Sequence, residues 1–303
     1  MTELTDFQRK ISTYLPDIKL SFQEPMAKHT SFRIGGPAEV MAFPENVQQL
    51  AEIMKVSALL DTVPAILGAG TNILSSDAGL PGLTVCLKDG LSGMEKLEGD
   101  RIRVYAGVTM TKAAVFAANQ GLSGMEFAHG IPGTVGGGVY MNAGAYGGEI
   151  KDICECVEVM TADGQLHTYS AEEMDFSYRH SRLEDEGGIV VSAVFRLTPK
   201  AKTQIKEKMR ELAAKRTASQ PLDKPSAGSA FKRPVGGYAA ALIDSAGLKG
   251  YQVGGAAVSE KHAGFVVNLG GATAEDVKAL LCQVSDQVFE KTGIRLEPEV
   301  RIW

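Results

Sequence analysis

The stretch GLSGMEFAHGIPGTVGGGVYMNAGAYGG, residues 121–148, holds ten glycines in 28 positions. Each interior glycine costs a helix about 0.5–1 kcal/mol relative to alanine, so this density argues against a regular helix. Flexible linkers are also rich in glycine, but they rarely carry large apolar side chains. This stretch has many of them, among them Met125, Phe127, Ile131, Val135, Val139, Tyr140, Met141 and Tyr146. We therefore predict a buried site lined by backbone groups.

Two glycine loops lie inside this stretch, at residues 130–138 and 142–147, and an earlier one (LGAGTNIL) occupies residues 67–74. Glycine lets main-chain N–H groups turn inward and lets a pyrophosphate approach without a Cβ in the way. The loops supply hydroxyl and amide donors and no acidic acceptors, which favours an anionic ligand. They form neither a Rossmann fingerprint, which needs glycine at position 73, nor a P-loop with its Lys-Ser/Thr. Tight turns in a core of small residues are the alternative.

The length and the net charge of the chain limit which classes of function are plausible. A chain of 303 residues suggests two or three domains. A net charge of -5 argues against nucleic acid or an anionic membrane as the main partner, and nothing in the sequence points to a protein partner. The absence of a signal pattern and of a run of ~18 apolar residues leads us to expect a cytoplasmic protein.

The four cysteines, Cys86, Cys154, Cys156 and Cys282, have no metal-ligand spacing, so we expect no metal site. Cys154 and Cys156 stand two apart in an alternating apolar run. We interpret them as buried cysteines of one strand rather than as a redox pair.

Hydrophobic periodicity predicts a mixed α+β chain. Predicted helices cover residues 46–60, 111–119, 203–215, 238–246 and 274–292, the last with Thr273 as N-cap and Asp276 at the capping-box position. Predicted strands cover residues 39–43, 64–67, 83–87, 101–106, 189–197 and 295–303, with others near Ala256 and Phe265 and a hairpin formed by 154–160 and 166–169.

Six segments together resemble the UDP-N-acetylenolpyruvoylglucosamine reductase family, flavoenzymes of bacterial peptidoglycan precursor synthesis also called UDP-N-acetylmuramate dehydrogenases. The match covers nearly the whole chain in the order and spacing of the family. The segments are HTSFRIGGPA (29–38), LGAGTNILSSD (67–77), GMEFAHGIPGTVGGGVYMNAGAYGGEI (124–150), FSYRHS (176–181), PSAGSAFKRP (225–234) and LEPEVRIW (296–303).

The resemblance implies an α+β fold with a two-lobed FAD-binding domain of the vanillyl-alcohol-oxidase (PCMH) type. This domain is expected over residues 1–200, with lobes at about 1–88 and 89–200, and a smaller α+β substrate-binding domain over 201–303. It also implies reduction of the enol ether of UDP-N-acetylglucosamine enolpyruvate to UDP-N-acetylmuramate, with FAD as mediator and NADPH as hydride donor. The segment between Tyr178 and Ile189 is too short for the tyrosine-bearing loop of one branch, so the chain resembles the shorter second type.

The resemblance places the FAD, held without a covalent bond, on the three glycine loops. His29 and His129 lie in FAD-lobe motifs, but the family does not bond its flavin to histidine. The residues expected to bind FAD are Gly68, Ala69, Gly70, Thr71, Asn72, Ile73, Gly130, Ile131, Pro132, Gly133, Thr134, Gly136, Gly137, Asn142, Gly144, Ala145, Tyr146 and Gly147.

The resemblance assigns three catalytic residues. Ser229 would give a proton to the carbon next to the substrate carboxylate, although a turn serine is the alternative from the residues alone. Arg179 would face that carboxylate with its guanidinium, unless it forms a surface ion pair with the acidic run at residues 184–186. Glu299 would lie near the same carboxylate, protonated or orienting a cation, with Glu297 as the fallback.

Substrate-binding roles are expected for Lys232, Arg233 and His262. Two cations beside Ser229 suit a diphosphate or a carboxylate. His262 could contact the nucleotide, while a partly buried structural histidine is an equally good interpretation. Two other functions remain open from the residues: another FAD oxidoreductase or oxidase of the same fold, and a non-catalytic sugar-nucleotide-binding protein.

Overall fold

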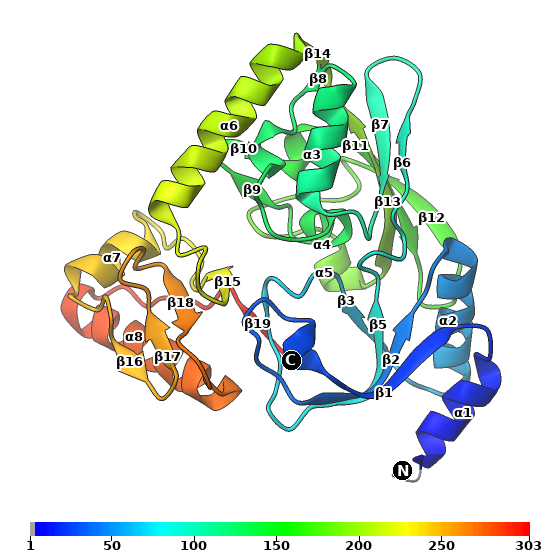
Figure 1. Ribbon diagram of the computed structural model, residues 1–303, viewed down its shortest axis with the longest axis horizontal. Helices are drawn as coiled ribbons and strands as arrows, with labels where there is room; N and C mark the ends of the chain where they lie inside the picture. The colour runs from blue at the N-terminus through cyan, green and yellow to red at the C-terminus, as the bar shows by residue number, and fades with distance from the viewer. Residues whose placement is uncertain (1–3) are drawn as a thin grey trace. The chain divides into compact units, whose positions relative to one another are not determined.

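The structure is a computed structural model that describes residues 4–303 (Figure 1). The chain forms two compact units. Unit 1 contains the residues up to Phe22 together with Val40–Ala69 and Gly82–Lys215, and unit 2 contains Gln23–Glu39, Gly70–Pro81 and Arg216–Trp303. Two early segments therefore group with the C-terminal part of the chain. The boundary expected near residue 200 divides the chain by binding role rather than by compactness, and it stays a prediction.

Unit 1 contains the second of two sheets and most of the first. Strands of the first, in the order β1-β2-β5-β3, are β1 (Lys19–Pro25), β2 (Pro37–Phe43), β5 (Leu80–Cys86) and β3 (Ala65–Leu67). Of these, β1, β2 and β5 extend into segments of unit 2. Strands of the second, in the order β12-β11-β13-β7-β6, are β12 (Leu166–Ser170), β11 (Cys154–Met160), β13 (Ile189–Arg196), β7 (Arg101–Tyr105) and β6 (Met94–Lys96). The predicted hairpin is confirmed as the antiparallel pair of β11 and β12.

The remaining elements of unit 1 are short pairs and helices. The helices are α1 (Asp6–Tyr14), α2 (Val47–Leu59), α3 (Met110–Asn119), α4 (Val135–Tyr140), α5 (Leu183–Glu186) and α6 (Lys202–Ser219), of which α6 runs into unit 2, with 3-10 turns η2 (Glu126–Ala128) and η3 (Ile150–Asp152). The short strand pairs are β9 (Gly144–Ala145) with β10 (Gly148–Glu149), and β14 (Thr198–Pro199) with β8 (Leu122–Ser123). The helices predicted at 46–60 and 111–119 are confirmed as α2 and α3.

Helix α4 corrects the expectation that the glycine-rich stretch contains no regular helix. Its sequence is VGGGVY, and the side chain of Thr134 caps it by accepting from Gly137 N. A Cβ at Gly136 would lie 2.9 Å from Ala106 Cβ, and one at Gly138 would lie 2.7 Å from Met110 Sδ. The absence of side chains lets this short helix pack closely on β7, α3 and the buried β13, and tertiary packing outweighs the low helix propensity of glycine.

Unit 2 is built around one antiparallel sheet and one long helix. The sheet has the order β15-β18-β17-β16, with β15 (Ser226–Ser229), β18 (Phe265–Asn268), β17 (Ala256–Val258) and β16 (Gln252–Val253). The other elements are α7 (Ala239–Ser245), α8 (Ala274–Thr292), the turn η1 (Met26–Lys28) and the parallel pair of β4 (Ile73–Leu74) with β19 (Arg301–Ile302). The core contains Val277, Leu280, Leu281 and Val284 of α8 together with Phe32, Ile34 and Leu74 from the early segments.

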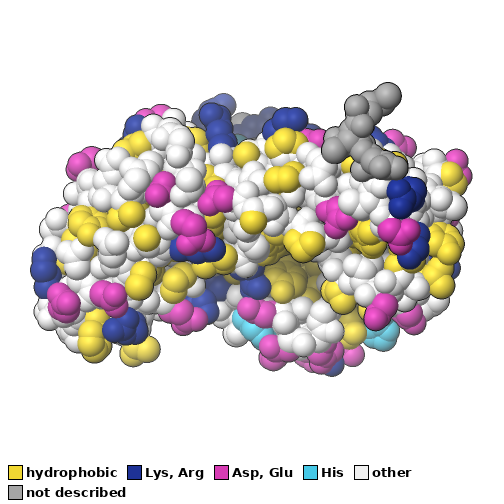
Figure 2. Space-filling view, turned by 90° about the horizontal axis from the view of Figure 1, so that it is seen from below, with side chains coloured by type: hydrophobic (Ala, Val, Ile, Leu, Met, Phe, Trp, Pro, Cys, Tyr) yellow, Lys and Arg dark blue, Asp and Glu magenta, His cyan; other side chains and the backbone are white. Residues whose placement is uncertain are grey.

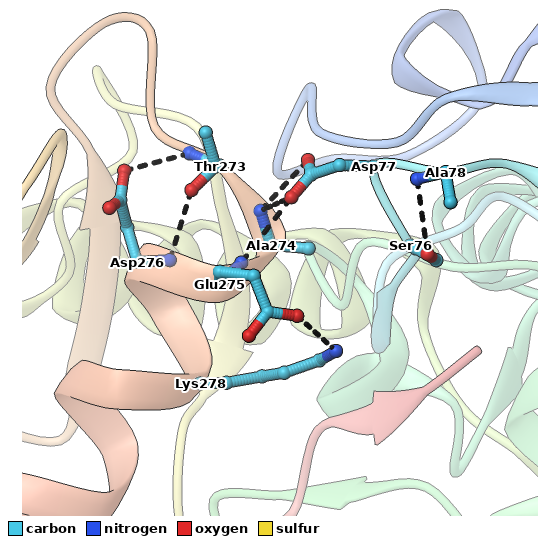
Figure 3. Close-up of polar contacts among 8 residues, drawn as sticks. All are labelled: Ser76, Asp77, Ala78, Thr273, Ala274, Glu275, Asp276 and Lys278. Carbon is cyan, nitrogen blue, oxygen red and sulfur yellow. Dashed lines mark hydrogen bonds and ion pairs between the residues drawn. The ribbon is translucent and has the colours of Figure 1, made fainter.

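The N-terminus of α8 confirms the predicted cap and adds a second one (Figure 3). The Thr273 side chain accepts from Asp276 N, and the Asp276 carboxylate accepts from Thr273 N, which completes the capping box. The carboxylate of Asp77, from the first glycine-loop motif, also accepts from Ala274 N at 2.8 Å and from Glu275 N at 3.4 Å. A carboxylate at a helix N-terminus is favoured by both the unpaired N–H groups and the helix dipole.

The predicted strand over residues 295–303 is wrong for most of its length. Only Arg301–Ile302 form a regular strand, β19. The segment before β19 makes only a local antiparallel bridge, between Pro298 and Phe231. The hydrogen bonds from Lys232 N to Glu297 O and from Glu299 N to Ala230 O flank this bridge.

Surface charge shows no field of a single sign on the face drawn in Figure 2, where acidic and basic side chains are interspersed. Within residues 4–303, no helix combines the length and the apolar character that a bilayer crossing requires.

Candidate functional site

The first glycine loop is divided between the units after Ala69. Its start, in unit 1, lies beside the second loop, because a Cβ at Gly68 would be 2.5 Å from Thr134 Oγ1. The structure thus brings together two of the three segments that the sequence assigns to a cofactor. The roles of Gly68 and Ala69 in binding stay predictions.

The second loop uses several of its own N–H groups inside the protein. Val135 N donates to Val108 O, Gly136 N donates to Ala106 O, and Gly137 N donates to Thr134 Oγ1. Gly130 N donates to Thr111 Oγ1, and Gly130 adopts φ +90°, where glycine is favoured. The N–H groups of Gly136 and Gly137 thus donate within the protein. All the predicted cofactor contacts of this loop stay predictions: Gly130, Ile131, Pro132, Gly133, Thr134, Gly136 and Gly137.

The third loop is fixed by the buried Asn142. Its Nδ2 donates to Ser177 O at 2.8 Å and to Glu149 Oε2 at 2.9 Å, while its Oδ1 accepts from Lys151 N. The loop turns at Tyr146 and Gly147, both with positive φ, between the paired β9 and β10. Asn142 thus joins the glycine loop to the segment that precedes Arg179.

Arg179 lies beside this third loop in unit 1. Its Nη2 is 3.5 Å from Gly144 O, and its guanidinium lies 5.0 Å from the ring centroid of Tyr178. In the nearby acidic run, Asp185 Oδ2 lies 3.0 Å from His180 Nε2, and Glu186 pairs with Arg182. Arg179 thus contacts the third glycine loop through Gly144, and its catalytic role stays a prediction.

One buried polar atom near the glycine loops has no protein partner. His129 Nδ1, at the end of η2 and directly before Gly130, makes no hydrogen bond among the described residues. A buried nitrogen left unpaired costs about 1–3 kcal/mol, which a polar ligand atom can offset. Together with the backbone-lined loops, this atom fits a polar cofactor such as FAD.

In unit 2, Ser229 ends β15 and is exposed, so a ligand can reach its hydroxyl. The following residues pair with the segment that carries Glu299: Lys232 N donates to Glu297 O at 2.8 Å, and Glu299 N donates to Ala230 O at 2.9 Å. The structure thus brings two of the three predicted catalytic residues into neighbouring segments.

The end of the first glycine loop joins the same assembly. Asn72 Nδ2 donates to Glu299 O at 3.2 Å, and Asn72 O accepts from Arg301 N at 3.0 Å. The sequence predicted Asn72 as a cofactor contact, together with Gly70, Thr71 and Ile73. It gave no sign that the side chain of Asn72 fastens the loop to Glu299.

The predicted substrate cations have partners of their own. Lys232 Nζ lies 2.6 Å from Glu297 Oε1 in an exposed pair, and the Arg233 guanidinium lies 4.6 Å from the ring centroid of Tyr238. His262 Nδ1 accepts from Gly264 N, and its ring meets Phe265 edge-on, while burial lowers the pKa of His262. His262 is therefore held neutral in a local turn, and its contact with a nucleotide stays a prediction.

Ser31 is the residue of this region that sequence reasoning missed. Its hydroxyl donates to Ser226 O at 2.6 Å, and its N–H donates to Gly70 O at 3.0 Å. The motif at 29–38 contributed to the resemblance without a role for any side chain. Proximity in space of segments 195 residues apart leaves no local signal in the sequence.

The cysteines are all unpaired, and β11 carries Cys154 and Cys156 with a bulge between them. Burial raises the pKa of the Cys154 thiol to about 12, so this thiol is inert at neutral pH. In residues 4–303, no three His, Cys, Asp or Glu side chains gather in a way that could hold a metal ion.

Two family models match the chain. Residues 38–170 match the FAD binding domain, and residues 220–303 match the C-terminal domain of UDP-N-acetylenolpyruvoylglucosamine reductase. Among curated proteins, the UDP-N-acetylenolpyruvoylglucosamine reductase of Agathobacter rectalis is 48% identical over 98% of this chain and 98% of that protein. The protein of the same name from Latilactobacillus sakei is 44% identical over 94% of this chain and 93% of its own length.

Among solved structures, UDP-N-acetylenolpyruvylglucosamine reductase from Thermus caldophilus is similar to this chain with a TM-score of 0.79 and 37% identity. The superposition covers 94% of this chain and 98% of that one.

Proposed function

The chain belongs to the UDP-N-acetylenolpyruvoylglucosamine reductase family, and on that basis we propose that it reduces UDP-N-acetylglucosamine enolpyruvate to UDP-N-acetylmuramate for peptidoglycan synthesis. The observation that carries the proposal is the 48% identity with a reductase of that name over 98% of both chains.

Membership of the family confirms the resemblance, the identification as an enzyme and the FAD cofactor predicted from the sequence. It also confirms the fold class, an α+β chain with an FAD-binding domain followed by a smaller C-terminal domain. FAD supplies the redox chemistry when bound, since it accepts and passes on a hydride.

The protein residues would handle the substrate and the proton. Reduction of the enol ether adds a hydride to one carbon and a proton to the carbon that bears the carboxylate. Ser229, exposed at the end of β15, would give that proton. Arg179 would stabilise negative charge on the carboxylate, and Glu299, half-buried beside Ala230, would orient the same group.

The finer parts of the proposal concern the partner molecules. NADPH would reduce the flavin, the flavin would be held without a covalent bond, and the reaction would take place in the cytoplasm. Lys232, Arg233 and His262 would contact the UDP part of the substrate. Support for the cations comes from their place in the segment that follows Ser229 directly.

The test is a two-step experiment on the purified protein. The flavin absorbance near ~450 nm, a property of the cofactor, is followed while NADPH is added without oxygen and the enolpyruvyl substrate is added afterwards. We expect bleaching in the first step and recovery of the colour, with formation of UDP-N-acetylmuramate, in the second. A flavin that reacts with NADPH but not with the enol ether would point to another oxidoreductase. A preparation that takes up no FAD would favour the alternative of a non-catalytic sugar-nucleotide-binding protein.

A further inference from the structure

Ser31 connects two parts of unit 2 that carry different predicted roles. One is the first glycine loop, which it contacts at Gly70 O through its N–H (3.0 Å) and its hydroxyl (3.3 Å). The other is β15, where the hydroxyl lies 2.6 Å from Ser226 O. The shorter distance marks Ser226 O as the main acceptor of the single hydroxyl proton.

The segment that carries Ser31 is held tightly on both sides. A Cβ at Gly70 would lie 2.0 Å from His29 O, so only glycine allows the loop to come this close. Asn268 of β18 donates from Nδ2 to Phe32 O at 3.0 Å, and the Phe32 side chain is buried in the core of the unit. The segment that presents Ser31 to Ser226 is thus held by a close backbone approach, a hydrogen bond and a buried side chain.

The strand that ends in Ser229 is irregular and needs such a support. β15 pairs with β18 at Ser226 and at Ser229, with a register shift between the two. Gly228 lies in this interval with φ +79° and has no atom within 4 Å of its Cβ position. Ser229 pairs with Phe265, and Ala230 N donates to Gly264 O at 2.8 Å, so the far end of the bulge is held by β18 and its turn. The position of Ser226 sets where the bulge that leads to Ser229 begins.

We propose that Ser31 is a positioning residue for proton transfer by Ser229: its hydroxyl fixes the start of the bulge that aims Ser229, and ties it to the loop expected to bind FAD. The inference rests on the proposed function, because it assumes that Ser229 is the proton donor. An acid as weak as a hydroxyl depends on its alignment, and displacements of about 1 Å cost about a hundredfold in rate.

The experiment compares the two half-reactions in stopped flow for the FAD-loaded wild type, Ser31→Ala and Ser31→Thr. We expect Ser31→Ala to slow reoxidation of the flavin by the enolpyruvyl substrate about tenfold, while reduction by NADPH stays within about twofold of the wild type. Because proton transfer then limits the rate, the solvent deuterium isotope effect on reoxidation should rise. Ser31→Thr keeps the hydroxyl and should restore the wild-type rate and isotope effect.

Ser57→Ala is the matched control. The Ser57 hydroxyl donates to Ile53 O at 2.8 Å in the buried face of α2, so the variant also loses one hydroxyl-to-carbonyl bond but lies in unit 1. It should leave both half-reactions unchanged. If Ser31→Ala does not fold, Ser31→Cys keeps the volume with a weaker donor and should show the same selective slowing.

Two results would contradict the role of Ser31 without contradicting the proposed function. One is a wild-type rate of reoxidation in Ser31→Ala. The other is an equal decrease of both half-reaction rates with an unchanged isotope effect. If the reduced wild type itself is not reoxidised by the enol ether, the proposed function fails as well, and the two failures are thereby distinguished.

Discussion

Glycines serve different purposes in helix α4 of unit 1 and in the part of the first glycine loop that belongs to unit 2. In unit 1, Gly136 and Gly138 of α4 are buried against Ala106 and Met110, so their small size allows a helix to pack on apolar neighbours. In unit 2, the loop from Gly70 to Asp77 is held by polar contacts, including Ser31 N to Gly70 O and Ser76 N to Trp303 O.

The difference shows that one residue type can answer two physical demands. Where glycine serves only to keep a side chain small, an alanine is accepted at positions that have no neighbour. Where two backbone segments are in direct contact, even the methyl group of alanine does not fit. The comparison is tested by substitutions that affect only one of these two roles of glycine, or that distinguish a catalytic residue from one that holds the loop in place.

The largest effect is expected for Ser229, the proposed proton donor in unit 2. Ser229→Ala should slow reoxidation of the flavin by the enol ether about 10²- to 10⁴-fold, because a positioned proton donor contributes that much. The rate of reduction by NADPH should stay the same. Stopped-flow absorbance measures both. Product formation at the wild-type rate would remove Ser229 from the proposed mechanism.

The next effect concerns the close approach at Gly70. Gly70→Ala should lower the free energy of unfolding by about 3 kcal/mol, because alanine is strained at positive φ and its Cβ meets His29 O. The matched variant Gly99→Ala has a similar φ of +69° but nothing within 4 Å, so it should cost only about 1 kcal/mol. Urea unfolding gives both values, and equal losses would contradict the argument.

Neighbouring glycines of α4 separate packing from helix propensity. Gly136→Ala should destabilise the protein by about 2 kcal/mol, because the added Cβ would lie 2.9 Å from Ala106 Cβ. Gly137 is exposed, and its nearest atom, Thr134 Oγ1, is 3.8 Å away, so Gly137→Ala should stabilise by about 0.5 kcal/mol. Urea unfolding of the protein without flavin measures both. The same sign for the two variants would refute the packing explanation of α4.

The polar support of the unit 2 loop is tested at Asp77. Asp77→Ala should lower the free energy of unfolding by about 1.5 kcal/mol, because Ala274 N and Glu275 N lose a charged acceptor. Asp77→Asn keeps an acceptor and should lose about half as much. Thr273→Ala, which removes the local cap of the same helix, is the reference for an ordinary N-cap. A neutral Asp77→Ala would show that the local cap is sufficient.

The smallest effect is expected for the pH dependence of unfolding that arises from the buried Cys154 thiol in unit 1. Burial holds the thiol pKa at about 12 in the folded chain, above the ordinary value of 9.0. The neutral thiol therefore stabilises the fold fully below pH 9, and this contribution is lost as the pH rises from 9 towards 12. Relative to Cys154→Ala, the wild type should lose about 0.8 kcal/mol of unfolding free energy between pH 7 and pH 9.5. Parallel pH profiles of urea unfolding would show that the thiol is not held neutral.

Patterns in short stretches of sequence predicted the helices and strands that are defined by residues close together in the chain. Thr273 and Asp276 together with the apolar period of α8 predicted both the start of that helix and its extent. The alternation around the turn at Asp163 predicted the hairpin of β11 and β12. The strand predicted to the C-terminus was wrong for most of its length, because apolar alternation does not show that the segment around Pro298 pairs only locally, with Phe231.

The contacts that a sequence could not indicate join distant segments. Ser31 and Ser226 are 195 positions apart, and Asp77 and Ala274 are 197 positions apart. Helix α4 was missed for the same reason, because its glycines are favourable only against Ala106 and Met110. Ser229, Arg179 and Glu299 were identified through family motifs, and their joint geometry stays a prediction.

The interleaving of unit 2 bears on how the nascent chain matures. Residues 23–39 and 70–81 leave the ribosome well before β18, α8 and β19, which are their partners in the core and in hydrogen bonding. Phe32, Ile34 and Leu74 therefore lack their core partners until the C-terminal segments are made, and closing loops of this length has an entropic cost. We expect the part of the first glycine loop in unit 2 to form late during synthesis, with these three side chains as the apolar surface that a chaperone would shield.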